Sequence, residues 1–103
     1  MLSYNITFNI DDEIHAEAIS YLRDVFIPSA ISCGKLSKPQ IWSISSISGE
    51  CFGNNYALQF NVDTMESLAD WIQTKEPRLM EDLREKFGET IVVFPTLLSA
   101  IQF

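Results

Sequence analysis

Residues 2–10 alternate between two kinds of side chain without interruption. One set is apolar or aromatic and the other is polar but uncharged: Leu2, Tyr4, Ile6, Phe8 and Ile10 against Ser3, Asn5, Thr7 and Asn9. A period of two predicts a half-buried strand with one face in the core. Since the opposite face carries no charge, we expect it to be partly closed, by a partner subunit or around a small wet cavity.

The next segment has the spacing of an amphipathic helix. Asp11 and Asp12 are expected to cap its start. Its buried stripe is expected at three- and four-residue intervals, on Ile14, Ala18, Tyr21, Leu22 and Val25. Pro28 lacks a backbone donor, so the helix is expected to kink or end just before it. A short turn over residues 29–33 should then close at Gly34 in a left-handed conformation.

Two strands are predicted in the middle of the chain. The first covers residues 40–48, where both faces carry apolar side chains and the register stays open (Ile41, Trp42, Ile44 and Ile47). A hairpin-type loop is expected around Gly49, Gly53, Asn54 and Asn55. The next strand, over residues 56–62, alternates clearly, with Tyr56, Leu58, Phe60 and Val62 inward and the uncharged Ala57, Gln59 and Asn61 outward.

A second helix and a last strand complete the pattern. Asp63 and Glu66 have the spacing of a capping box. The expected buried stripe is Leu68, Trp71, Ile72, Leu79, Leu83 and Phe87, interrupted by Pro77 and ended by Gly88. The apolar run over residues 91–94 suits a covered strand. Residues 95–103 are so apolar that we expect them to dock on the core or on a neighbour.

The element order is strand, helix, strand, strand, helix, strand. It predicts one ferredoxin-like α+β domain over residues 1–103, with a four-stranded antiparallel sheet and both helices on one face. Two helices cannot cover two faces of a sheet. The free face is therefore expected to meet water or a second subunit, in the latter case as a dimeric α+β barrel.

Composition excludes several classes of partner. The chain has 103 residues and a net charge of −7, with seven scattered Lys and Arg residues, which disfavours nucleic acid. No apolar run is long enough for a membrane span. The N-terminus lacks the pattern of a signal peptide, so we expect a cytoplasmic protein. Cys33 and Cys51 lack metal-site spacing, and we expect free thiols rather than a disulfide.

The candidate functional residues lie on the uncharged strand faces. We predict a ligand-binding or dimer interface made by Asn5, Thr7, Asn9, Gln59 and Asn61. No metal site, cofactor or catalytic residue is predicted. His15, the one histidine, is a candidate acid–base group, but an exposed or capping role is favoured. Trp42 and Trp71 could line a pocket, although aromatic residues in an apolar stripe are usually core.

Several short segments resemble the uncharacterised bacterial family DUF4286. They are spread over almost the whole chain: Tyr4-Asn5-Ile6-Thr7, His15, Ile27-Pro28, Gly34-Lys35, Tyr56-x-Leu58-Gln59-Phe60, Glu76-Pro77-Arg78-Leu79, Phe87-Gly88 and Phe94-Pro95-Thr96-Leu97-Leu98. The resemblance implies a small protein with a ferredoxin-like or dimeric α+β barrel fold. It implies no activity.

Residues 63–71 also resemble the start of the second helix in antibiotic-biosynthesis-type monooxygenases. The haem-degrading members of that group use an Asn, a Trp and a His. Asn5 or Asn9 could supply the Asn, but residues 61–62 contain no Trp and residues 79–87 contain no His. The resemblance therefore does not extend to haem degradation.

We thus expect a homodimeric interaction or small-ligand-binding protein that is not an enzyme. The alternative is a cofactor-independent, monooxygenase-like enzyme acting on a small organic molecule inside the barrel. A closed pocket beside Asn5 and Gln59, reached by a titratable group, would favour the enzyme. A flat or tightly packed face would favour simple assembly.

Overall fold

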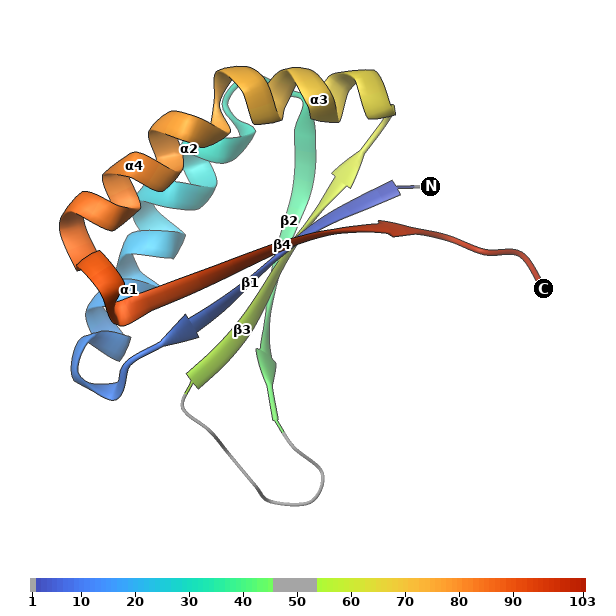
Figure 1. Cartoon of the computed structure of the whole chain (residues 1–103). Coiled ribbons are helices and arrows are strands. Elements are labelled where there is room, and N and C mark those ends of the chain that lie inside the picture. Colours follow the sequence, from blue (N-terminus) through green and yellow to red (C-terminus); the bar gives the residue numbers. More distant parts are fainter. Residues whose placement is uncertain (1, 46–53) are drawn as a thin grey trace.

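A computed structural model describes residues 2–45 and 54–103. In this part of the chain, four strands form one antiparallel sheet in the order β2-β3-β1-β4. The helices of the described residues all lie on one face of this sheet, and none of them covers the other face (Figure 1). The structure confirms the predicted ferredoxin-like α+β fold.

The two central strands supply most of the sheet's contribution to the core. Strand β1 (Leu2–Ile10) pairs along its whole length with β3 (Asn54–Val62). Most of the predicted inward side chains of both strands are buried under the helices: Tyr4, Ile6, Phe8, Ile10, Leu58, Phe60 and Val62. The other two, Leu2 and Tyr56, are half-buried. The alternation therefore predicted both the strands and the face that each side chain occupies.

The first helical segment continues through Pro28 by changing its winding. It runs as the short 3-10 turn η1 (Asp12–Ile14), α1 (His15–Tyr21), the π-helical turn η2 (Leu22–Phe26) and α2 (Ile27–Ile31). The Ile27 amide donates to the Leu22 carbonyl, five residues back. Each such wider turn holds one more residue than an α-helical turn. The change of winding directly before Pro28 lets the helical segment continue past a residue that has no backbone donor.

The wider turn corrects the predicted buried stripe. Val25 is 49% exposed, whereas Phe26 is fully buried and packs edge-to-face on Phe8 with ring centroids 5.7 Å apart. The predicted cap is also wrong. The Asp11 side chain makes no capping hydrogen bond, and the Asp12 carboxylate accepts from the Asn54 amide at 2.7 Å. The left-handed conformation of Gly34 is confirmed, with φ of +80°.

Strand β2 (Leu36–Ile44) begins four residues earlier than predicted. An irregularity between Ser37 and Gln40 interrupts its pairing with β3, and Lys38 there has φ of +49°. Two apolar faces gave no alternation that could have fixed these limits. Ile47, Gly49 and Gly53 lie outside the described residues.

Asn54 and Asn55 belong to β3 rather than to the predicted loop. Their side chains hold them in the sheet. The Asn9 amide donates to the Asn55 carbonyl oxygen at 2.8 Å, and the Asn54 amide donates to the Ile10 backbone carbonyl at 3.3 Å.

The second helical segment is divided at Lys75 into α3 (Met65–Thr74) and α4 (Glu76–Phe87). Pro77 lies in the first turn of α4, and Gly88, with φ of +61°, ends it. The predicted capping box is displaced by one residue, because the Thr64 hydroxyl, not the Asp63 carboxylate, accepts from the Ser67 amide at 3.0 Å.

One residue of the stripe predicted for this segment is not buried. Trp71 is fully buried, but Ile72 is 38% exposed. The remaining stripe residues of the two helices are buried, as predicted: Leu68, Leu79, Leu83 and Phe87.

After the short turn η3 (Gly88–Thr90), strand β4 runs over Ile91–Ser99. The strand is longer than the predicted residues 91–94 and is not covered, since it forms one edge of the sheet and Val92 and Phe94 are exposed. Residues 100–103 have no regular structure and project beyond the sheet (Figure 1).

Candidate functional site

The face of the sheet without helices gathers the predicted site residues. In the register of β1 and β3, Asn5 lies opposite Gln59, and Ser3 lies opposite Asn61. Directly paired residues of an antiparallel sheet point to the same face, and residues two apart on one strand do so too. Asn5, Thr7, Asn9, Gln59 and Asn61 therefore form one group, which we call the polar strip.

The polar strip is only partly hydrogen-bonded. The Asn5 amide donates to the Thr7 hydroxyl at 3.0 Å, and the Asn9 amide donates to Asn55. Asn5 is 9% exposed, and its side-chain carbonyl oxygen is buried without a hydrogen-bond partner among the described residues. Leaving a buried acceptor unpaired costs roughly 1–3 kcal/mol, so this oxygen is a place where a further donor would bind favourably.

Apolar side chains border the polar strip on both edge strands. On β2, Trp42 pairs with Ala57 and is 54% exposed. On β4, Phe94 pairs with Thr7 and is 55% exposed. By the same register, these two belong to an exposed group, which we call the apolar frame: Trp42, Ile44, Val92, Phe94 and Leu98.

Sequence reasoning missed the apolar frame. The sequence predicts a covered strand over residues 91–94 and favours a core position for Trp42, and the exposure of Phe94 and Trp42 shows that both predictions are wrong. The signal was present in β4, where every second residue pairs with an outward residue of β1: Val92, Phe94, Thr96 and Leu98. This set is visible only once the strand is known to extend to Ser99.

Trp71 and Tyr4 lie on the opposite, helix-covered side. The Trp71 indole donates to the Ala30 carbonyl at 2.9 Å, which makes it a core residue with its polar atom satisfied. The Tyr4 ring packs edge-to-face on it, with centroids 5.6 Å apart, and its hydroxyl donates to the Glu76 carboxylate at 2.7 Å. Burial, followed by the hydrogen bond to Glu76 and the charge of that carboxylate, raises the pKa of Tyr4 well above its ordinary value.

His15 is also separated from the polar strip. It is half-buried, its ring stacks on Tyr56 with centroids 5.4 Å apart, and its Nε2 lies 2.5 Å from the Tyr56 hydroxyl. Tyr56 belongs to the inward set of β3, so this pair lies on the helix side. The structure does not bring His15 to the residues around Asn5.

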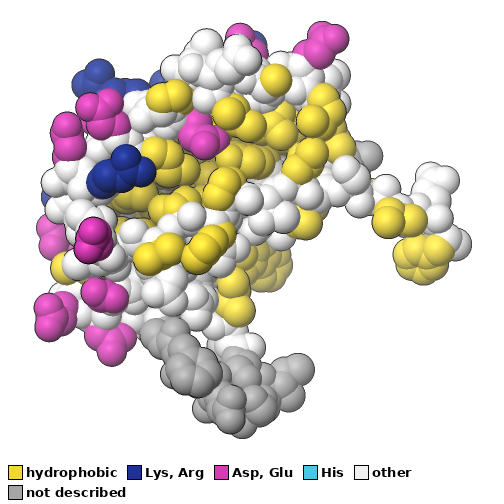
Figure 2. Space-filling model, viewed as in Figure 1, with side chains coloured by type: hydrophobic (Ala, Val, Ile, Leu, Met, Phe, Trp, Pro, Cys, Tyr) yellow, Lys and Arg dark blue, Asp and Glu magenta, His cyan; other side chains and the backbone are white. Residues whose placement is uncertain are grey.

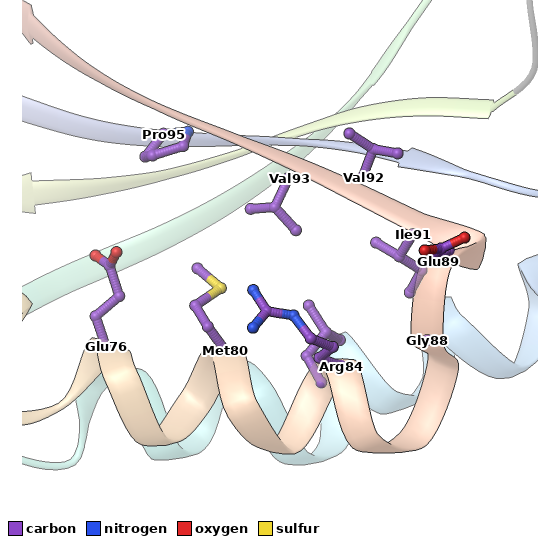
Figure 3. A pocket seen from close by; sticks show the side chains of 10 residues that line it. Glu76, Met80, Arg84, Gly88, Glu89, Ile91, Val92, Val93 and Pro95 are labelled. Carbon is purple, nitrogen blue, oxygen red and sulfur yellow. The ribbon is translucent and has the colours of Figure 1, made fainter.

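A groove of about 710 Å³ lies between α4 and β4. Its walls include Met80 and Leu83 from the helix and Val93 from the strand (Figure 3). This cavity lies on the helix side of the sheet, whereas the expectation for an enzyme was a pocket beside Asn5 and Gln59. Glu76, Arg84 and Glu89 are the charged residues that line it.

In residues 2–45 and 54–103, no group of three or more His, Cys, Asp and Glu side chains could hold a metal ion. The same residues include no helix that is both long and apolar enough to cross a membrane. Cys33 is exposed, and Cys51 lies outside the described residues.

Comparison with solved structures places the fold among ferredoxin-like, dimeric α+β barrel proteins. An EthD-family protein from Bacillus halodurans superposes with a TM-score of 0.68 at 17% identity, covering 93% of this chain and 97% of that one. A Deinococcus radiodurans protein, named as a candidate antibiotic biosynthesis monooxygenase, gives 0.67 at 12% identity, with 100% and 95% covered. SnoaB from Streptomyces nogalater, a cofactor-independent oxygenase crystallised as a mutant, gives 0.64 at 11% identity, with 99% and 94% covered.

The chain belongs to the DUF4286 family, a domain of unknown function, whose model matches residues 1–101. This match confirms the resemblance seen in the sequence. A search of curated proteins found no significant match. The identities to the solved structures are low enough that they establish the fold alone.

Proposed function

We propose that the protein works as a homodimer whose two uncovered sheet faces meet and enclose a polar interior that binds a small neutral molecule. The observation that carries this proposal is the buried, unpartnered side-chain oxygen of Asn5 at the centre of the polar strip. A bound hydroxyl or amide would donate to it. The surrounding apolar frame would exclude water from the same space.

The occupant that best fits the face is a second copy of this chain. Each chain has a net charge of −7, so most orientations of two copies bring like charges together. On the sheet face without helices, the residues at paired strand positions carry no charge, and they include the apolar frame. Two such faces can meet without electrostatic repulsion and can bury their exposed apolar side chains.

The apolar tail supports the same arrangement. Ile101 is 80% exposed and Phe103 is fully exposed at the projecting end of the chain. Figure 2 shows hydrophobic side chains at this end standing away from the body of the protein. In the single chain these side chains are exposed, and a second subunit against the sheet would give them a surface to contact.

The residues on the sheet face without helices favour a binding role over acid–base catalysis. The outward positions of the described strands are occupied by Asn, Gln, Thr, Ser and apolar residues, and none of them titrates near neutral pH. A polar strip of this composition can hold and orient a molecule through hydrogen bonds. The enzyme alternative would need a general acid or base from elsewhere.

The assembly is tested by light scattering on matched variants. The wild-type protein should have twice the chain mass of 11.7 kDa at micromolar concentration. Phe94→Asp places a charge within the apolar frame and should give a monomer. Val25→Asp makes a similar change at a site 49% exposed on the helix side and should remain dimeric. A monomeric wild-type protein, or equal dissociation of both variants, would contradict the dimer.

The ligand is tested by native mass spectrometry of the purified dimer. We expect a small adduct on the wild-type protein that is lost from Asn5→Leu, a change of similar side-chain volume, while the dimer mass is kept. Ser20→Leu, at an exposed helical site, is the control and should retain the adduct. An adduct that persists in Asn5→Leu would show that the molecule binds elsewhere.

A further inference from the structure

The groove between α4 and β4 is a concave site whose lining lies mainly on the helix side of the sheet. It has apolar walls on two sides: Met80 and Leu83 from α4, and Ile91, Val92, Val93 and Pro95 from β4. In Figure 3 the Val93 side chain points from the strand toward the helix. Its volume of about 710 Å³ falls in the range typical of sites for small organic molecules.

Charged groups stand at defined places along this groove. Glu76 lies at one end and Glu89 at the other, and the Arg84 side chain extends between them (Figure 3). The Glu76 carboxylate accepts the hydrogen bond from the Tyr4 hydroxyl, so its position is fixed from the sheet side. Neither Arg84 nor Glu89 forms an ion pair within the described part of the chain.

We propose that this groove binds an apolar organic cation, with its amine at Glu76 and its hydrocarbon body between Met80 and Val93. Two carboxylates and one guanidinium line the groove, which leaves an excess negative charge. Glu76 is half-buried while Arg84 is exposed, so the carboxylate is less screened by water and acts more strongly on a bound charge. The net charge of −7 also favours the approach of cations.

The groove and the proposed dimer face share one residue. Most of the lining lies on the helix side of the sheet, whereas Asn5 and the rest of the polar strip face the other way, but Val92 of the apolar frame also lines the groove. Figure 2 shows hydrophobic side chains gathered in the region where α4 and β4 lie in Figure 1, with acidic and basic side chains around them. The proposed amine contact at Glu76 and the hydrocarbon contacts at Met80 and Val93 lie outside the apolar frame.

The proposal is tested by amide NMR titration with three probes that share one hydrocarbon body: phenylbutylamine, phenylbutanol and phenylbutyrate. We expect the amine to bind tightest and to shift the amide signals of Glu76, Met80 and Val93. Glu76→Gln keeps the shape and an acceptor for Tyr4 but removes the charge, and should weaken amine binding about tenfold or more. Glu81→Gln makes the same change at an exposed site of α4 and should leave binding unaltered.

Three results would overturn the proposal. The first is binding of phenylbutyrate at least as tight as that of the amine, which would make Arg84 the anchor. The second is equal weakening by Glu76→Gln and Glu81→Gln, which would indicate attraction by overall charge alone. The third is the absence of shifts at the groove residues with any probe up to its solubility. Thermal melting of each variant confirms that the fold is intact, and the dimer mass is recorded separately.

Discussion

The Tyr4 hydroxyl donates a 2.7 Å hydrogen bond to the Glu76 carboxylate, across 72 positions of sequence. Tyr4 lies on β1 and Glu76 in the first turn of α4, so this contact joins the central strand to the second helical segment. Removing the hydroxyl leaves a carboxylate without its buried donor. We expect Tyr4→Phe to lower the free energy of unfolding by about 1–2 kcal/mol in urea titrations.

Tyr21→Phe is the matched control for that change. The Tyr21 hydroxyl makes no hydrogen bond in the described structure, and its ring packs on Phe87 either way. We expect a loss below about 0.5 kcal/mol. Equal losses in the two variants would show that the contact with Glu76 contributes nothing to stability.

The raised pKa of Tyr4 predicts a loss of stability at alkaline pH. In the unfolded chain Tyr4 loses its proton near the ordinary value of 10.0, while in the folded protein it keeps it to higher pH. The folded state therefore binds more protons, so the stabilisation is fully present below pH 10.0 and declines as the pH rises above it. The slope from this one group approaches about 1.4 kcal/mol per pH unit.

Tyr4→Phe removes this group and should flatten the alkaline part of the stability profile. Urea titrations of the wild type and the variant, below and above pH 10.0, measure how the free energy of unfolding of each protein changes with pH. Parallel profiles for the wild type and the variant would contradict the assignment of the raised pKa to Tyr4.

The π-helical turn η2 predicts a contrast between two neighbouring residues. Phe26 is fully buried on Phe8, and Val25 is half exposed. Phe26→Ala should lower the free energy of unfolding by about 3–5 kcal/mol, because it opens a cavity in the core. Val25→Ala should change it by no more than about 0.5 kcal/mol. The reverse order would mean that the helix follows the regular stripe of the sequence.

The cap of α3 can be located in the same way. The Thr64 hydroxyl accepts from the Ser67 amide, whereas Asp63 is exposed. We expect Thr64→Ala to cost about 1 kcal/mol of stability. Asp63→Ala should cost less than about 0.5 kcal/mol. Thermal melting followed by circular dichroism compares the two, and a larger loss for Asp63→Ala would restore the capping box expected from the sequence.

The projecting tail gives a prediction for the proposed dimer. Residues 97–99 belong to β4, so a cut at Leu97 would damage the sheet as well. Replacing both Ile101 and Phe103 by Ser leaves every strand intact and should raise the concentration at which the dimer dissociates. Gln102→Ser is the control. An unchanged dilution profile would show that the tail takes no part in assembly.

Regular alternation was the part of the fold that could be predicted from the sequence. In β1 and β3, apolar and polar side chains alternate with a period of two, so the sequence indicates which face each residue occupies. The buried side of these strands and the polar strip could both be predicted from this alternation. Prediction failed where backbone geometry changed the period. The wider turn before Pro28 moved the buried position from Val25 to Phe26, and the irregularity near Lys38 interrupts the pairing of β2 with β3 in a part of the strand that the sequence did not predict.

The remaining features depend on neighbours that are distant in the sequence. To predict the apolar frame, one would have to know that β2 and β4 are the two edges of the sheet. The groove requires the relative placement of α4 and β4, which follows from packing of the whole domain. The alternation within β4 indicates one side of the apolar frame, but no local pattern of residues shows that the two edge strands share a face or that α4 lies beside β4.

The two edge strands both contain features that limit growth of the sheet. Strand β2 has the left-handed Lys38 followed by Pro39, and β4 contains Pro95. Proline lacks an amide donor, and a local irregularity bends the strand, so neither edge offers a continuous ladder to an incoming strand. Concentrated protein should therefore stop at closed assemblies of defined size instead of extending into fibres.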